Sequence, residues 1–275
     1  MTFQDKLDAA ARKNRSLLCV GLDVDPDLMG DRDLARFCQR IIDATSDLVC
    51  AYKPNWGFYE ALGLEGLGAL MQLRERIPAS IPVIGDVKRG DIGNTSTMSA
   101  RAMFDVFGFD AVTVNPYLGF DALEPYIAYR DRTSLVLCRT SNPGAEEFQS
   151  LLVEPSSGNG LGPAPPMRLY ERVAEQARIW NTYGNVGLVV GATYPEELER
   201  VRELCPDQVI LVPGIGPQGG DLVTAVHAGV DRSGQHVIIS ASRQVLYASR
   251  AEDYAEAARA AALRLRDAIN AARGM

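Results

Sequence analysis

The sequence lacks the features of membrane-bound, secreted and zinc-dependent proteins. It contains no stretch near the roughly 18 apolar residues of a membrane-spanning helix, and its first residues, several of them charged, do not form a signal peptide. Its five cysteines are odd in number and widely spaced, without a C-x-x-C pair, which argues against a disulfide framework or a zinc site. We therefore expect a cytoplasmic protein that binds no metal.

Positive charge and histidine are also scarce. The formal net charge of -7 leaves no basic field for nucleic acid or an anionic membrane, so we expect neither as a partner. An anionic small molecule would have to be held by individual Lys or Arg side chains. Of the two histidines, His227 falls in a helical segment and His236 begins a strand, so both are expected to be structural. The commonest general base is then missing.

What the chain does contain is an alternation of short apolar runs and longer helical patterns, repeated about eight times. The runs are rich in β-branched residues and nearly continuous, as in parallel strands buried on both faces. The expected strands are Ser16–Asp23, Leu48–Pro54, Pro82–Lys88, Ala111–Asn115, Ser134–Arg139, Val186–Val190, Gln208–Pro213 and His236–Ser240. Helices are expected at segments such as Asp33–Ser46, Tyr59–Arg76, Thr95–Phe107, Met167–Asn181, Pro195–Leu204 and Ala251–Ala272.

This alternation predicts the α/β class and a (β/α)8 TIM barrel. The competing fold, a doubly wound open sheet, normally carries a G-x-G-x-x-G turn after its first strand, and no such turn is present. At 275 residues with 47% hydrophobic composition, the chain can form one barrel domain over residues 1–275.

One segment interrupts the rhythm. Residues Glu154–Pro166 form a Gly/Pro/Ser-rich run that favours neither helix nor strand. Because it follows the fifth strand, it should lie near the rim where barrel enzymes carry their active sites. Both a surface insertion and a lid are compatible with this sequence.

Charged residues gather at the expected carboxyl ends of three strands. Asp86 and Lys88 lie two apart on the third strand and therefore face the same way, and Asp91 follows shortly after. Asp23 ends the first strand and Lys53 the second. Since desolvating several charges together costs several kcal/mol per ion unless they are paired, this cluster favours a functional site over a set of structural ion pairs.

A candidate phosphate site follows the last two strands. The segment 212–221, V-P-G-I-G-P-Q-G-G-D, contains four glycines whose backbone amides can approach an anion. Arg243 follows the eighth strand. The loops after strands seven and eight commonly bind phosphate in TIM barrels, and an arginine can hold phosphate through two N–H groups.

Taken together, these motifs resemble the orotidine 5′-phosphate decarboxylase family, specifically its longer bacterial-type branch. The matching strings are G-L-D (21–23), Y-K-P-N followed by F-Y-E (52–60), D-V-K-R-G-D-I-G-N-T (86–95), S-N-P-G-A-E (141–146), the segment 212–221 and S-R-x-x-x-Y around Arg243. They follow the family's order and cover nearly the whole chain. Two departures are Ser242, where many relatives have Gly, and the longer segment Glu154–Pro166.

The resemblance implies that the protein decarboxylates orotidine 5′-monophosphate to UMP and CO2, the last step of de novo pyrimidine nucleotide biosynthesis, without a cofactor. Lys88 would donate a proton to C6 of the pyrimidine, and Asp86 would lie beside the departing carboxylate. Lys53 and Asp91 would complete an array of alternating charges. A fixed ammonium group can stabilise the C6 carbanion electrostatically before it donates the proton.

The resemblance also implies a homodimer with shared active sites, in which Asp91, Ile92 and Thr95 serve the neighbouring subunit's site. Asp23 and Lys53 would hold ribose hydroxyls, and Ser141 would read the pyrimidine edge. The residues implied for the phosphate side are Pro213, Gln218, Gly219 and Arg243, where Gln218 bridges base and phosphate and Arg243 holds the phosphate.

Two alternatives remain at this point. A magnesium-dependent sugar-phosphate decarboxylase or synthase of the same superfamily would use a similar D-x-K-x-x-D element to stabilise an enediolate. The K-P-N motif, S-N-P-G-A-E and the Gln218 loop favour the nucleotide enzyme over it. A non-catalytic nucleotide-binding protein should lack a member of the charged array, yet Lys53, Asp86, Lys88 and Asp91 are all present.

Overall fold

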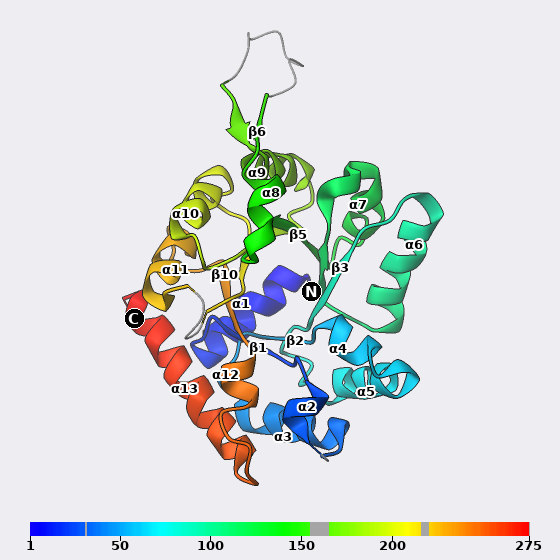
Figure 1. Ribbon diagram of the computed structural model, residues 1–275, viewed down its shortest axis with the longest axis vertical. Coiled ribbons are helices and arrows are strands. Elements are labelled where there is room, and N and C mark those ends of the chain that lie inside the picture. The colour runs from blue at the N-terminus through cyan, green and yellow to red at the C-terminus, as the bar shows by residue number, and fades with distance from the viewer. Residues whose placement is uncertain (31, 155–164, 216–219, 275) are drawn as a thin grey trace.

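Eight parallel strands alternate with helices and form a ring, as the predicted TIM barrel requires (Figure 1). The computed structural model describes residues 1–30, 32–154, 165–215 and 220–274. Around the ring the strands follow the order β2-β1-β10-β9-β8-β5-β4-β3. Their bounds are β1 Leu18–Gly21, β2 Ala51–Lys53, β3 Ile84–Arg89, β4 Ala111–Val114, β5 Thr133–Arg139, β8 Val186–Val190, β9 Ile210–Val212 and β10 Val237–Ala241. Each expected strand is present.

The ring closes between β2 and β3, where strand pairing is sparse. Among the described residues, these strands meet through two isolated bridges, Tyr52 with Val83 and Asn55 with Asp86. The Asp86 backbone N–H donates to the Pro54 carbonyl at 3.0 Å. By contrast, five residue pairs join β5 to β8. The seam of the barrel therefore runs between β2 and β3 and includes Asp86.

Helices surround the barrel, and none of those described is long and apolar enough to cross a membrane. Their bounds are α1 Phe3–Asn14, α2 Pro26–Met29, α3 Leu34–Thr45, α4 Trp56–Glu60, α5 Gly63–Arg76, α6 Gly93–Arg101, α7 Phe120–Ile127, α8 Glu146–Gln149, α9 Leu169–Trp180, α10 Pro195–Leu204, α11 Leu222–Gly229, α12 Arg243–Leu246 and α13 Tyr254–Ala272, with short turns η1 Ala102–Val106, η2 Pro116–Leu118 and η3 Pro143–Ala145. The Asp33 side chain caps α3 by accepting from the Arg36 N–H, as a residue with a free carboxylate at this position should.

Two of the expected helices are interrupted within their predicted bounds. The segment Tyr59–Arg76 forms two helices, α4 and α5, because Gly63 adopts a left-handed conformation (φ +60°) that ends the first helical run. The segment Thr95–Phe107 is helical only as far as Arg101 and then widens into the π-helical turn η1.

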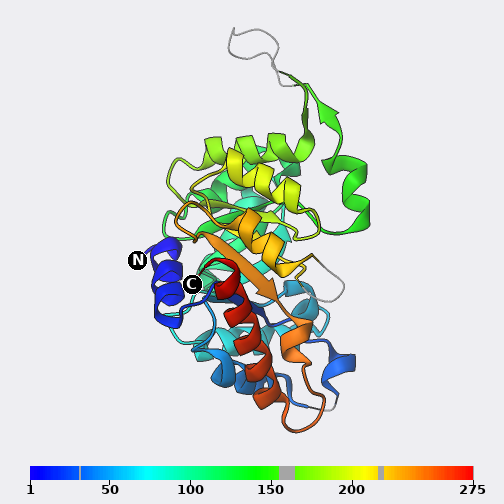
Figure 2. The same ribbon diagram turned by 90° about the vertical axis from the view of Figure 1, so that its left-hand side faces the viewer.

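The predicted insertion is flanked by a hairpin outside the barrel. β6 (Leu152–Val153) and β7 (Met167–Arg168) pair antiparallel and stand beyond the ring of helices in both views (Figures 1 and 2). β7 occupies the first two residues of the expected helix Met167–Asn181, so that helix begins at Leu169 instead. Residues 155–164, the interior of the expected insertion, lie outside the described residues.

Helix α1 lies across the end of the barrel where the strands begin (Figures 1 and 2). The Lys6 ammonium is 2.9 Å from both carboxylate oxygens of Asp110, which directly precedes β4. Arg132 and Arg74 approach the same carboxylate at 3.3 and 3.6 Å, and the Val83 backbone N–H donates to it at 2.8 Å. This Asp110 cluster, buried and satisfied on every side, fastens α1 to the barrel.

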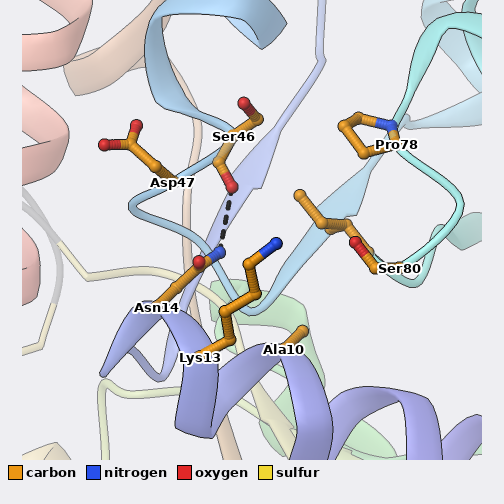
Figure 3. A pocket seen from close by; sticks show the side chains of 8 residues that line it. Ala10, Lys13, Asn14, Ser46, Asp47, Pro78 and Ser80 are labelled. Atoms are coloured by element: carbon orange, nitrogen blue, oxygen red, sulfur yellow. Dashed lines mark hydrogen bonds between the residues drawn. The ribbon is translucent and has the colours of Figure 1, made fainter.

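A small cavity of about 130 Å³ lies at the same end (Figure 3). It separates α1 from the segments that precede β2 and β3, and the Asn14 amide crosses to donate to the Ser46 carbonyl at 2.9 Å. In TIM barrels this end of the strands serves stability, whereas the opposite end carries the chemistry. The active site is therefore expected at the other end of the barrel.

Candidate active site

A cavity of about 740 Å³ opens at the carboxyl ends of the strands. Its size falls within the range of small-ligand sites, and its walls come from the ends of most strands of the barrel. The described residues that line it are Asp23, Lys53, Asn55, Phe58, Asp86, Ser141, Thr193, Pro213, Gly214, Ile215, Ser240, Ser242, Arg243 and Gln244. The cavity thus gathers residues from distant parts of the chain, as barrel active sites do.

Asp86 is the centre of the charged group. Its Oδ2 accepts from the Lys53 ammonium at 2.7 Å and from the Asn55 amide at 3.4 Å. Its Oδ1 accepts from the Lys88 ammonium at 2.6 Å and from the Thr113 hydroxyl at 3.0 Å. With donors on both oxygens, the carboxylate is held in one orientation.

The surroundings keep this group charged. Burial favours the neutral acid, but the ammonium groups of Lys53 and Lys88 outweigh it and hold the pKa of Asp86 well below its usual range. Burial likewise opposes the charge on Lys53, but the carboxylates of Asp23 and Asp86 raise the pKa of Lys53 above its usual value. At neutral pH the group therefore presents alternating negative and positive charges.

The two lysines differ in access. The Lys53 side chain is 5% exposed, whereas that of Lys88 is 49% exposed. Lys53 is therefore enclosed beside its carboxylate neighbours, whereas the Lys88 side chain is open to solvent and contacts Asp86, which lines the cavity.

Asp23 has an oxygen available for a further partner. Its Oδ1 lies 4.0 Å from the Lys53 ammonium and, although buried, has no hydrogen-bond partner among the described residues. A buried carboxylate oxygen without a partner costs free energy. A ligand hydroxyl that donates to Asp23 would remove this cost.

The backbone of Lys88 departs from regular strand geometry. Its φ is +47°, a left-handed conformation that is costly for a residue with a side chain. The pairing of β3 with β4 shifts register between Gly85 and Arg89, which is a feature that re-aims side chains next to active sites. The period-two alternation of a strand thus brings Lys88 to Asp86 only together with this register shift and the left-handed backbone of Lys88.

The predicted phosphate side is formed by the loops after β9 and β10. Arg243 begins α12 and lines the cavity together with Pro213. The Gln244 amide donates to the Ile215 carbonyl at 3.1 Å, which ties the two loops together. Gln218 and Gly219 lie outside the described residues.

Four of the predicted site residues that the structure describes do not line this cavity: Lys88, Asp91, Ile92 and Thr95. Lys88 is joined to the lining through its contact with Asp86. Asp91, Ile92 and Thr95 lie beyond the end of β3, at the start of α6. The Asp91 carboxylate accepts from the Ile92 backbone N–H at 2.8 Å, and Ile92 is 59% exposed. Within one subunit, these side chains therefore point elsewhere.

Comparison with known proteins places this geometry in a family. The model of the orotidine 5′-phosphate decarboxylase / HUMPS family matches residues 16–261. The chain belongs to this family. It is 51% identical to the orotidine 5′-phosphate decarboxylase of Roseiflexus sp. (strain RS-1), with 99% of this chain and 98% of that protein covered. It is 50% identical to the enzyme of Thermomicrobium roseum, with coverage of 98% and 95%.

The fold agrees with solved structures of the decarboxylase family. The structure of the Leishmania donovani OMP decarboxylase matches with a TM-score of 0.85 at 40% identity, and each chain is fully covered. The family resemblance inferred from the ordered motifs is thereby confirmed.

Of the two departures from the decarboxylase family pattern, Ser242 is explained by its neighbour. A Cβ atom at Gly21 would lie 2.0 Å from the Ser242 hydroxyl oxygen, so the glycine of the G-L-D motif leaves the room that the serine side chain occupies. Ser141 is accommodated in the same manner, since a Cβ at Gly191 would lie 2.8 Å from the Ser141 Cβ.

Several cavity residues were not predicted from the sequence. Asn55 stands within the K-P-N motif and could have been selected with Lys53, whereas Thr193 and Gln244 carry no sequence signal. Thr113, which donates to Asp86 from outside the described cavity lining, carries no sequence signal either. The two histidines lie away from the described cavity lining, with the His236 ring 2.8 Å from Asp231. The described residues contain no group of three or more His, Cys, Asp or Glu side chains placed to hold a metal ion.

Proposed function

We propose that this chain decarboxylates orotidine 5′-monophosphate to UMP and CO2 by means of the charges that meet at Asp86. The reaction belongs to pyrimidine nucleotide biosynthesis, and relatives about 50% identical over their full length carry this activity in their names. The observation that carries the mechanism is the placement of Lys53 and Lys88 on the two oxygens of one buried carboxylate, at the edge of a ligand-sized cavity.

Lys88 performs the proton transfer. When the bond between C6 and the carboxylate breaks, CO2 leaves and the electron pair of that bond remains on C6. The Lys88 ammonium, close to that carbon, stabilises the developing charge and then donates a proton to it. The neutral amine regains a proton from solvent, to which the half-exposed side chain has access.

Asp86 acts on the ground state. Its donors on both oxygens prevent the carboxylate from turning away, and its lowered pKa keeps it ionised. A substrate carboxylate placed beside it is repelled, and this repulsion is relieved as neutral CO2 forms. Lys53 holds Asp86 in place from the opposite side.

The remaining cavity residues bind the nucleotide. Asp23 and Lys53 hold the ribose hydroxyls, which is supported by the buried Asp23 oxygen that has no hydrogen-bond partner among the described residues. Ser141 reads the pyrimidine edge. The phosphate is held by Arg243 with the loop that contains Pro213, Gln218 and Gly219, and this remote group supplies binding energy that positions the ring.

The active unit is a homodimer in which Asp91, Ile92 and Thr95 complete the partner's site. Support comes from exposed apolar side chains around the start of α6 and on the neighbouring η2 and α7: Ile92, Met98, Tyr117, Leu118 and Phe120, each at least 42% exposed. Exposed apolar surface of this kind is typical of a protein–protein interface. Asp91 lies at its edge and can extend into a partner.

Buried thiols support a cytoplasmic location. All five cysteines are buried and free, and burial raises the pKa of Cys19 and Cys38 to about 12. Unpaired cysteines that serve as small apolar side chains are typical of proteins kept in a reducing compartment.

An assay in metal-free buffer tests the activity. We expect the absorbance of orotidine 5′-monophosphate to fall and CO2 to be released at the same rate with and without EDTA. The sugar-phosphate alternative predicts no turnover of this substrate, or activity that EDTA abolishes and Mg²⁺ restores. Either of these results would refute the proposal.

Mixing two inactive variants tests the shared site. If Asp91 and Lys88 of one site come from different chains, a heterodimer of Asp91→Ala and Lys88→Ala subunits has one site with both lesions and one with neither. Up to half of the wild-type activity per mixed dimer should then return. If subunit exchange is confirmed by mass spectrometry and no activity returns, Asp91 serves its own subunit and the shared-site model is wrong.

A further inference from the structure

Thr113 occupies an unusual position for a polar side chain. It lies inside β4 between Val112 and Val114, is 1% exposed, and does not line the described cavity. A buried hydroxyl in the interior of a strand is stable only if its hydrogen bonds are satisfied. Its oxygen lies 2.9 Å from the Lys88 backbone nitrogen and 3.0 Å from Oδ1 of Asp86.

We propose that Thr113 is a positioning residue for the decarboxylation, whose hydroxyl sets the geometry between Lys88 and Asp86. The proposal rests on the proposed function of those two residues, and it assigns a role to a side chain that does not touch the substrate.

The chemistry of the three groups determines the direction of both hydrogen bonds. A backbone N–H can only donate, so the Thr113 oxygen accepts from Lys88. An ionised carboxylate can only accept, so the single hydroxyl proton goes to Asp86. The hydroxyl therefore has no alternative orientation in which both neighbours are satisfied.

The hydroxyl replaces a ladder bond that β3 lacks. The register of β3 against β4 shifts between Gly85 and Arg89, and Lys88 within this interval has a φ of +47°. Its N–H, turned out of regular pairing, would be left without a partner near the rim if the Thr113 hydroxyl were removed. Thr113 thus stabilises the backbone conformation from which the Lys88 side chain departs.

The same hydroxyl also holds the other end of that side chain. Oδ1 of Asp86 accepts from both Thr113 and the Lys88 ammonium, at 3.0 and 2.6 Å. The interactions form a closed ring that runs from the Lys88 backbone N–H through the Thr113 hydroxyl and the Asp86 carboxylate to the Lys88 ammonium. Thr113 thus holds both the backbone of Lys88 and the carboxylate that the Lys88 ammonium contacts. Loss of the hydroxyl should therefore displace the proton donor while leaving the ribose and phosphate contacts in place.

Two substitutions separate the hydroxyl from the shape of the side chain. Thr113→Val keeps a similar volume and removes the hydroxyl, whereas Thr113→Ser keeps the hydroxyl. We expect kcat to fall on the order of 10- to 100-fold in Thr113→Val, since small displacements of reacting groups have effects of this size. The KM for orotidine 5′-monophosphate and the Kd for UMP should change less than about threefold, and Thr113→Ser should remain within about threefold of the wild-type kcat.

A matched control uses the next strand. Thr133 begins β5 at the opposite end of the barrel and is also buried, so Thr133→Val makes the same chemical change away from Asp86 and should leave kcat unchanged. If Thr113→Val does not fold, as judged by circular dichroism, Thr113→Ala provides the variant without a hydroxyl.

Several outcomes would overturn the proposal: a kcat for Thr113→Val within threefold of wild type, a Thr113→Ser variant as slow as Thr113→Val, or a parallel loss of UMP binding. Wild-type turnover is measured first. A wild-type protein that fails to decarboxylate the nucleotide refutes the proposed function, whereas an active wild type with an equally active Thr113→Val refutes only the role of Thr113.

Discussion

The two ends of the barrel each place a buried carboxylate among cations, yet they differ in what surrounds it. At the carboxyl ends of the strands, Asp86 is held by Lys53 and Lys88 beside a cavity of about 740 Å³. At the other end, Asp110 is covered by α1 and paired with Lys6. The Lys88 side chain is 49% exposed and that of Lys6 is 11% exposed.

A convergence of charges therefore does not by itself indicate catalysis. The Asp110 cluster directs three cations and one backbone N–H onto a single carboxylate, and its closest cation, Lys6, is nearly buried. The Asp86 group keeps one ammonium accessible. The exposure of one ammonium group beside a cavity, more than the number of charges, distinguishes the Asp86 group from the Asp110 cluster.

The largest expected effect is a difference in kcat between variants of Lys88 and Lys6. Lys88→Ala removes the proposed proton donor, and we expect kcat to fall at least about 1,000-fold, or roughly 4 kcal/mol in activation free energy. UMP binding, measured by calorimetry, should be retained. Lys6→Ala should leave the kcat of the folded protein within about twofold. Activity of Lys88→Ala within tenfold of wild type would show that another group protonates C6.

At the end of the barrel that α1 covers, we expect the opposite pattern, a loss of stability without a loss of kcat. Asp110→Ala leaves Lys6, Arg74 and Arg132 without their common carboxylate, and removal of one partner from a buried ion pair typically costs about 3–5 kcal/mol. Urea unfolding should show a loss of this size while kcat of the folded fraction stays unchanged. Lys88→Ala, at a half-exposed site, should change the unfolding free energy by less than about 1 kcal/mol. Equal losses in the two variants would remove the distinction between the ends.

A smaller effect is expected at the far side of the cavity. Arg243→Ala removes the proposed charge-assisted hydrogen bonds to the phosphate, worth about 1.5–3 kcal/mol, so the Kd for UMP should rise roughly 10- to 150-fold. The affinity for uridine, which lacks the phosphate, should be nearly unchanged. A similar weakening for uridine would place Arg243 at the base or the ribose instead.

The smallest effect concerns acid stability. Because the pKa of Asp86 is lower in the folded protein than the ordinary value of 3.8, the unfolded chain takes up a proton first as the pH falls. Asp86 therefore contributes stability that is fully present above about pH 5 and is lost progressively as the pH falls below 4.

The measurement is the change in unfolding free energy between pH 6 and pH 3. We expect Asp86→Asn to lose less stability over this interval than wild type, by up to about 1 kcal/mol. Arg259→Ala gives a comparison at an exposed site, since it removes the hydrogen bond that lowers the pKa of Asp47, and its effect on this pH dependence should be smaller. An unchanged pH dependence in Asp86→Asn would contradict the electrostatic description of the site.

Much of the reactive end could be predicted from the sequence because it depends on local rules. Period-two alternation and the position of strand ends are sufficient to bring Lys53 and Asp86 to one rim, and both strands are present where the apolar runs indicate. The strand Val186–Val190 was predicted to the residue. Breaks within helices were harder to predict, because the division at Gly63 depends on a backbone conformation that the amphipathic pattern does not reveal.

The Asp110 cluster could not be predicted from the sequence, and neither could the contacts of Thr113. Lys6 and Asp110 are 104 residues apart, and nothing in their local sequence links them before the barrel is assembled. Thr113 meets Lys88 through a register shift between neighbouring strands. Periodicity predicts which face a side chain occupies but not which residue of the adjacent strand it meets.

The sparse strand pairing at the seam between β2 and β3 lies at the same place as the Asp86 carboxylate. Where only isolated bridges join two strands, local opening requires the loss of few hydrogen bonds. Such opening would draw Lys53 away from Asp86 and admit water between them. A nucleotide that contacts residues on both strands would bind the closed seam better than the open one. Part of its binding free energy would therefore be added to the free energy of local opening. Amide hydrogen exchange along the seam would then report on occupancy of the site without any chemistry taking place.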